Sequence, residues 1–153
     1  ATEKVEMLRN LGAKVIQVKT ASIANPNHYV NVARKIANET KGGFFSDQFE
    51  NQANFETHYL TTAKEIWNQC KGKVDAFVMG AGTGGTIAGV SKFLKEKNGH
   101  IKVYLVDPNG SSLFNKVKYG VCYTSQQAES GMERHRYDSI AEGIGLDRVT
   151  ENF

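Results

Sequence analysis

The stretch "VDAFVMGAGTGGTIAGV", from Val74 to Val90, constrains the fold more than any other part of the sequence. An apolar run leads into four glycines and two threonines within seven residues, and a second apolar run follows. This order predicts a buried strand, a tight turn and a helix. The backbone amides of such a turn and the positive end of the helix dipole point at one place, where an anion can bind.

The pattern leaves several ligands open. A Walker-type nucleotide loop needs a lysine after its last glycine, and Thr86 stands there instead. Gly80, Gly82 and Gly85 fit the dinucleotide pattern G-x-G-x-x-G, with Asp107 ending the next predicted strand. However, this motif follows two earlier helix and strand units, and its two hydroxyls suit one dianionic phosphate monoester better than a pyrophosphate. We therefore favour a compact ester such as pyridoxal phosphate, with NAD and a ligand-free turn as alternatives.

The remainder of the chain alternates predicted helices and strands. Helices are predicted at 2–11, 25–40, 58–70 and 83–97, and strands at 13–19, 42–49, 73–80 and 100–107. This alternation predicts an α/β fold with parallel sheets and flanking helices. Residues 51–57 are interpreted as a polar connection ending in a helix cap at Thr57, 115–137 as a long surface excursion, and 140–153 as a strand and turn.

Apolar spacing also predicts which helical side chains are buried. The second helix starts with Pro26 in its first turn, and its apolar face consists of Tyr29, Val32, Ala33 and Ile36. The third helix is expected to bury Leu60, Ala63, Ile66 or Trp67, and Cys70.

Composition excludes several classes of protein. The chain has 153 residues, 40% hydrophobic and 23% charged, as a folded globular domain requires. Its net charge of +3 comes from scattered basic residues, so no nucleic-acid partner is expected. No apolar stretch approaches the roughly 20 residues that cross a bilayer. The two cysteines and four histidines share no metal-ligand spacing, so we expect no metal site. Two cysteines are too few for a disulfide scaffold, so we expect an intracellular compartment, cytoplasmic or mitochondrial.

Five stretches of the sequence carry a resemblance to one family of enzymes. They are "KVEMLRNLGAKV", "DQFENQANFETHYLTTAKEIW", "GAGTGGTIAGVSKFLK", "VDPNGSS" and "EGIGLD". In this order they resemble segments of the cysteine synthase and cystathionine β-synthase group of pyridoxal-phosphate enzymes, where the first is similar to the helix and strand ahead of the substrate region, the second to the asparagine-rich run, and the third to the phosphate loop and following helix. The resemblance implies the α/β fold of the fold type II enzymes, with 1–57 in a smaller substrate-side domain and 58–153 in a larger cofactor-binding domain.

The resemblance also implies roles for individual residues. The cofactor phosphate would be held by Gly82, Thr83, Gly84, Gly85 and Thr86. Gly143 would lie near the cofactor ring, and Gln48 would contact the carboxylate of the substrate. The chain departs from the family at Gln52 and Phe55, where prolines are usual.

The implied parent enzyme makes cysteine from O-acetylserine and sulfide by β-replacement on pyridoxal 5'-phosphate, and is expected to be a homodimer. The lysine that forms a Schiff base with the cofactor stands in a Ser-x-Lys-type motif, which this sequence lacks. We therefore expect these residues to be the middle of a longer enzyme and to be inactive alone, with no catalytic residue among them. The alternatives are cystathionine β-synthase activity with serine and a thiol, an NAD-dependent oxidoreductase, and an inactive binding module.

Overall fold

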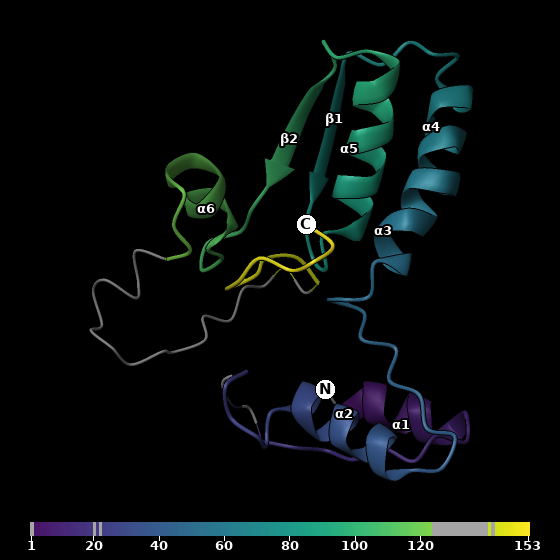
Figure 1. Ribbon diagram of the computed structural model, residues 1–153, viewed down its shortest axis with the longest axis vertical. Helices are drawn as coiled ribbons and strands as arrows, with labels where there is room; N and C mark the ends of the chain where they lie inside the picture. Colours follow the sequence, from purple (N-terminus) through teal and green to yellow (C-terminus); the bar gives the residue numbers. More distant parts are fainter. Residues whose placement is uncertain (1, 20, 22, 124–140, 142) are drawn as a thin grey trace. The chain divides into compact units, whose positions relative to one another are not determined.

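The computed structural model describes residues 2–19, 21, 23–123, 141 and 143–153. The chain falls into two compact units, Ala1–Asp47 and Gln48–Phe153 (Figure 1). None of the helices in the described ranges combines the length and the apolar character that a membrane crossing requires. The expected boundary after residue 57, between two domains of a longer enzyme, stays a prediction.

The first unit contains two helices, α1 (Thr2–Asn10) and α2 (Tyr29–Glu39), both of which the sequence predicts. The imidazole of His28 caps α2 by accepting a hydrogen bond from the Val30 amide at 3.3 Å. Pro26 therefore lies before the helix and not in its first turn, which corrects the prediction. The predicted strands at 13–19 and 42–49 are wrong, because neither segment has a ladder partner among the described residues.

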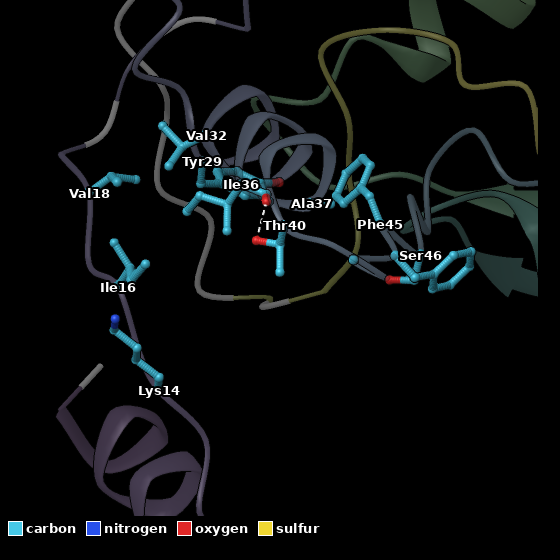
Figure 2. Close-up of a pocket in the computed structure, with 13 residues that line it drawn as sticks. Lys14, Ile16, Val18, Tyr29, Val32, Ile36, Ala37, Thr40, Phe45 and Ser46 are labelled. Carbon is cyan, nitrogen blue, oxygen red and sulfur yellow. Dashed lines mark hydrogen bonds between the residues drawn. The ribbon is translucent and has the colours of Figure 1, made fainter.

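The predicted apolar face of α2 lines a hollow in this unit (Figure 2). Tyr29, Val32 and Ile36 face this hollow, together with Ile16 and Val18 from the extended segment after α1. Its volume is about 530 Å³, and none of the predicted site residues lines it. The face is apolar as predicted, but only Val30 of α2 is buried.

The second unit carries the parallel sheet and its covering helices. Its elements are α3 (Ala53–Thr57), η1 (His58–Thr62), α4 (Ala63–Gln69), β1 (Ala76–Gly80), α5 (Gly85–Lys97), β2 (Lys102–Val106) and α6 (Leu113–Tyr119). The two strands pair in parallel, with Phe77 opposite Val103 and Met79 opposite Leu105. In Figure 1, α5 lies between the strands and the column formed by α3 and α4. The predicted α/β class with a parallel sheet and flanking helices is confirmed.

The segment before β1 differs from its prediction. Residues 53–57 form helix α3 and not a polar connection, and Thr57 is its last residue, with its hydroxyl donating to the Ala53 carbonyl at 2.7 Å. The predicted third helix opens with the π-helical turn η1, which holds more residues per turn than an α-helix and shifts the buried face. The predicted burial of Ala63 is confirmed and Ile66 and Trp67 are half-buried, whereas Leu60 and Cys70 are exposed.

Two apolar clusters hold the second unit together. One, between α4 and α5, is centred on Ala63, Val90, Phe93, Leu94 and Ile101. The other joins α5 to α6 and is centred on Ala81, Ile87 and Leu113. Both clusters contact the inward face of the sheet, while Val78, Tyr104 and Val106 on its other face are half exposed. The two clusters fix β1 and α5, and hence the loop that joins them.

The last part of the chain only partly follows its prediction. Residues 115–119 belong to helix α6, so the start of the predicted surface excursion is helical. Residues 120–123 belong to no helix or strand, and the last part of that excursion, 124–137, lies outside the described residues. The segment 143–153 contains turns but no strand, since no ladder partner lies beside it in the described ranges.

Candidate functional site

The loop between β1 and α5 is the candidate site. Gly84 takes the N-cap position of α5 with φ +90, a left-handed conformation that favours glycine. Helix α5 follows with thirteen residues and carries Lys95 and Lys97 in its last turn, where basic side chains complement the dipole. Its first turn therefore offers an anion both unpaired amides and a positive potential.

Several backbone carbonyls of this loop have hydrogen-bond partners, whereas its backbone amides have none among the described residues. The carbonyls of Ala81, Thr83 and Gly84 accept hydrogen bonds from Gly145 N, Thr150 Oγ1 and Ala88 N at 2.8, 2.7 and 3.0 Å. No backbone amide from 82 to 86 donates to another described residue. Within the described residues, the loop thus pairs the carbonyls of 81, 83 and 84 and leaves the amides of 82–86 unpaired.

The two threonine hydroxyls of the loop are held by side chains from the α3–η1 segment. The amide nitrogen Nδ2 of Asn54 lies 2.8 Å from Thr83 Oγ1. Nε2 of His58 lies 3.0 Å from Thr86 Oγ1, and its Nδ1 lies 3.0 Å from Thr62 Oγ1. Each hydroxyl therefore has a fixed partner on the protein side.

Glycines in this loop allow close protein contacts. A Cβ built on Gly82 would lie 2.4 Å from the carbonyl oxygen of Gly143, and one on Gly85 would lie 2.3 Å from Asn54 Oδ1. At Gly84 the added atom would lie 2.7 Å from Cβ of Phe153. In the structure, the missing side chains of these glycines admit the C-terminal segment and α3.

The structure brings Gly143 to the loop, as the yellow segment beside the start of α5 in Figure 1 illustrates. Gly145 N binds the Ala81 carbonyl, and Leu146 O accepts hydrogen bonds from the hydroxyls of Ser111 and Ser112 at 3.0 and 3.1 Å. These contacts clamp the segment between the loop and the start of α6.

Gln48 reaches the same network through its backbone. Its carbonyl accepts from Asn54 Nδ2 at 3.1 Å and from Asn152 Nδ2 at 3.3 Å. Its side-chain amide is exposed and binds no other described residue. One asparagine, Asn54, thus links the predicted substrate residue Gln48 to the predicted cofactor residue Thr83.

Asp107, which the dinucleotide alternative assigns to a ribose, has a structural contact. Its Oδ2 accepts a hydrogen bond from the Phe114 amide at 2.7 Å, in the first turn of α6. Among the residues that the structure describes, no group of three or more potential ligands could hold a metal ion.

A phosphate monoester fits this loop on three grounds. The donors are the amides of 82–86, unpaired in the described ranges, and the two threonine hydroxyls; the helix dipole is positive there, and the carbonyls of 81, 83 and 84 are already occupied. These features suit a small dianion, and they lie where the sequence predicts the cofactor phosphate.

Four residues of this network are not predicted from the sequence. The spacing of the histidines predicts no metal ligand at His58, and the sequence predicts no role for Asn54, Thr150 or Asn152. The sequence does contain a signal for Asn54 and His58. They are four residues apart and therefore lie on one side of a helical segment. Nothing local marks Thr150 and Asn152, which act through contacts far along the chain.

The chain is similar to known proteins along its whole length. A family model described as "Pyridoxal-phosphate dependent enzyme" matches residues 1–153. A protein of Saccharomyces cerevisiae named "Putative mitochondrial cysteine synthase" is 52% identical over 99% of this chain and 40% of its own length. "Cysteine synthase 2" of Neurospora crassa is 49% identical over 100% of this chain and 36% of its own length. A "Cystathionine beta-synthase" of Apis mellifera is 47% identical over 96% of this chain and 27% of its own length. The chain thus spans about two fifths, or less, of these relatives.

Proposed function

The chain belongs to the family of pyridoxal-phosphate dependent enzymes, and from that premise we propose that it carries the phosphate-binding residues of a cysteine synthase. The reaction is the replacement of the acetate of O-acetylserine by sulfide, with cysteine as product. The observation that carries the phosphate site is the loop between β1 and α5, whose amides from 82 to 86 are unpaired within the described residues. The choice of reaction is supported by relatives named cysteine synthase at 49% and 52% identity.

Each group has a part in binding the reactants. The amides of 82–86 and the hydroxyls of Thr83 and Thr86 bind the phosphate dianion. Gln48 donates its side-chain amide to the carboxylate of the amino-acid substrate, and the backbone at Gly143 borders the cofactor ring. Bound pyridoxal phosphate supplies the electron sink that lets an α-proton be removed from an amino acid.

The phosphate site is tested by removing one hydroxyl in the full-length natural protein. Thr86→Val keeps the shape of the side chain, and we expect it to weaken pyridoxal phosphate about ten- to hundredfold in equilibrium dialysis, as for a hydrogen bond to a charged group. Thr61→Val is the matched control, because the Thr61 hydroxyl donates to the Thr57 carbonyl. Equal binding of pyridoxal phosphate and pyridoxal by the natural protein would contradict the phosphate site.

Cysteine formation from O-acetylserine and sulfide tests the reaction itself. A second candidate, cystathionine β-synthase activity, is favoured by the relative from Apis mellifera at 47% identity. The two differ in substrates, so the same protein is assayed with serine and homocysteine. Turnover of that pair alone would replace the first proposal with the second.

Location and assembly extend the proposal. The name of the Saccharomyces cerevisiae relative supports a mitochondrial site. The homodimer that the family resemblance implies is part of the proposal. Cell fractionation checks the first, and sedimentation of the full-length protein checks the second.

A further inference from the structure

We propose that Asn54 and His58 are positioning residues that fix the hydroxyls of Thr83 and Thr86 for the cofactor phosphate, with His58 carrying its proton on Nε2. This inference rests on the proposed phosphate site and names the residues that prepare it. Two features of the second unit support it: a pair of glycines on α5 and a pair of polar contacts to the loop hydroxyls.

Two glycines on α5 let the α3–η1 segment come close. Gly85 and Gly89 are four residues apart and therefore lie on one face of the helix. A Cβ at Gly85 would lie 2.3 Å from Asn54 Oδ1, and one at Gly89 would lie 2.6 Å from the Phe55 carbonyl and 2.8 Å from the Tyr59 amide. Larger residues would push the segment away.

The polar pair on the facing segment has the same spacing. Asn54 and His58 are also four residues apart, one in α3 and one at the start of the π-helical turn. They contact Thr83 and Thr86 at 2.8 and 3.0 Å. A π-helical turn is rare and is found often at functional sites, which agrees with a role for His58 beyond packing.

The direction of the Asn54 bond is set by its second partner. Its Nδ2 also contacts the Gln48 carbonyl, which can only accept, so the nitrogen must be on that side. Thr83 Oγ1 therefore accepts from Asn54, and the proton of its own hydroxyl stays available for an anion.

The direction of the His58 bond depends on its tautomer. With the proton on Nε2, His58 donates to Thr86, accepts at Nδ1 from Thr62, and leaves the Thr86 proton for the phosphate. With the proton on Nδ1, Thr86 must donate to His58 and has none left. Because a phosphate dianion only accepts, its binding selects the Nε2–H tautomer.

The first test compares two substitutions of His58 in the full-length protein. His58→Phe removes the donor and should weaken pyridoxal phosphate about ten- to hundredfold. His58→Gln keeps an N–H near the position of Nε2 and should recover most of the loss. Binding of pyridoxal, which has no phosphate, should change in neither variant, and His100→Gln, at an exposed position, should bind as the natural protein does.

Asn54 is tested in parallel with Asn54→Asp, which keeps the shape but cannot donate to Thr83. The matched control is Asn51→Asp, which adds the same charge three residues away. We expect a loss of pyridoxal phosphate affinity of about tenfold or more in the first and a clearly smaller change in the second. Equal losses would overturn the role of Asn54.

The tautomer is read directly in the natural protein by long-range ¹H–¹⁵N spectra of labelled histidine, so this test does not depend on the folding of any variant. In the presence of pyridoxal phosphate, Nε2 of His58 should be protonated and Nδ1 should not. The opposite tautomer or a doubly protonated ring would overturn the inference.

Binding of the two cofactor forms separates this inference from the proposed function. If the natural protein prefers pyridoxal phosphate over pyridoxal while His58→Phe binds both normally, the positioning role is wrong and the phosphate site stands. If the natural protein has no such preference, the proposed function itself fails.

Discussion

The side-chain oxygen of Asn152 accepts a hydrogen bond from the backbone amide of Phe55 at 3.1 Å, across 97 positions of sequence. The amide nitrogen of the same side chain donates to the carbonyls of Phe49 at 2.8 Å and Gln48 at 3.3 Å. Only 1% of Asn152 is exposed. One buried side chain therefore ties the end of the chain to the segment that carries Gln48 and Asn54.

Asn152→Ala should lower the free energy of unfolding by about 2–3 kcal/mol, because it removes three part-buried hydrogen bonds of a buried side chain. Denaturant unfolding of the full-length protein measures the change. Asn109→Ala, at an exposed position, is the control and should change stability by less than about 0.5 kcal/mol. A loss at Asn152 as small as that of the control would show that water replaces its contacts.

The sequence predicts the second unit better than the first, for a physical reason. Strands β1 and β2 are apolar runs and helix α5 has an apolar face, and each of the three packs on elements that follow or precede it closely in the chain. The segments 13–19 and 42–49 also have strand-like composition, but a strand needs a partner for its ladder, and local pattern does not supply one. The π-helical turn at 58–62 is not predicted, for a different reason: its apolar spacing resembles that of an α-helix.

In the candidate site, too, local features can be predicted from the sequence and long-range contacts cannot. The loop from 82 to 86 is predictable because strand, glycines, hydroxyls and helix stand next to one another in the sequence. Its supports at Asn152 and Thr150 are not, since their partners Phe55 and Thr83 lie 97 and 67 positions away. Contacts of this kind depend on how separate segments pack and leave no local period.

Gly82→Ala tests the close approach of the C-terminal segment to the loop. The added Cβ would lie 2.4 Å from the Gly143 carbonyl oxygen, so one backbone must move. We expect a loss of stability of about 1–3 kcal/mol and at least tenfold weaker binding of pyridoxal phosphate. Gly99→Ala is the matched control, because its Cβ would meet nothing within 4 Å and its backbone is not in the left-handed region. Similar behaviour of the two variants would contradict the contact between Gly82 and Gly143.

Leu94→Ala compared with Leu60→Ala tests the corrected position of the buried face. Leu94 of α5 is fully buried in the cluster that contains Ala63 of α4, whereas 52% of Leu60 is exposed. The first substitution should cost about 2–5 kcal/mol through lost burial and a cavity. The second should cost much less, about 0.5 kcal/mol or under. If both cost several kcal/mol in denaturant unfolding, the face predicted from the sequence would be right after all.

Gln48→Ala separates the two halves of the proposed site. Its side chain is exposed and its carbonyl is the group that binds Asn54, so the substitution should leave the affinity for pyridoxal phosphate unchanged. The KM for O-acetylserine should rise about ten- to hundredfold, as for a lost hydrogen bond to a carboxylate. Steady-state kinetics and dialysis measure the two effects, with Gln52→Ala as control. An equal loss of cofactor affinity would show that the side chain acts through the loop.

Tyr59 offers a prediction about pH. The Glu96 carboxylate accepts a hydrogen bond from the Tyr59 hydroxyl at 2.6 Å, and this bond raises the pKa of Tyr59 above its usual value of about 10. Since the folded-state pKa is the higher one, the stabilisation is present below pH of about 10 and is lost as the pH rises through the raised pKa. Glu96→Gln removes the charge, so the pKa of Tyr59 should fall toward the usual value. A ¹³C titration of the tyrosine rings measures it, with Glu65→Gln as control because Glu65 is not bonded to Tyr59. A Tyr59 that titrates at the same pH in the natural protein and in Glu96→Gln would show that this hydrogen bond does not form in solution.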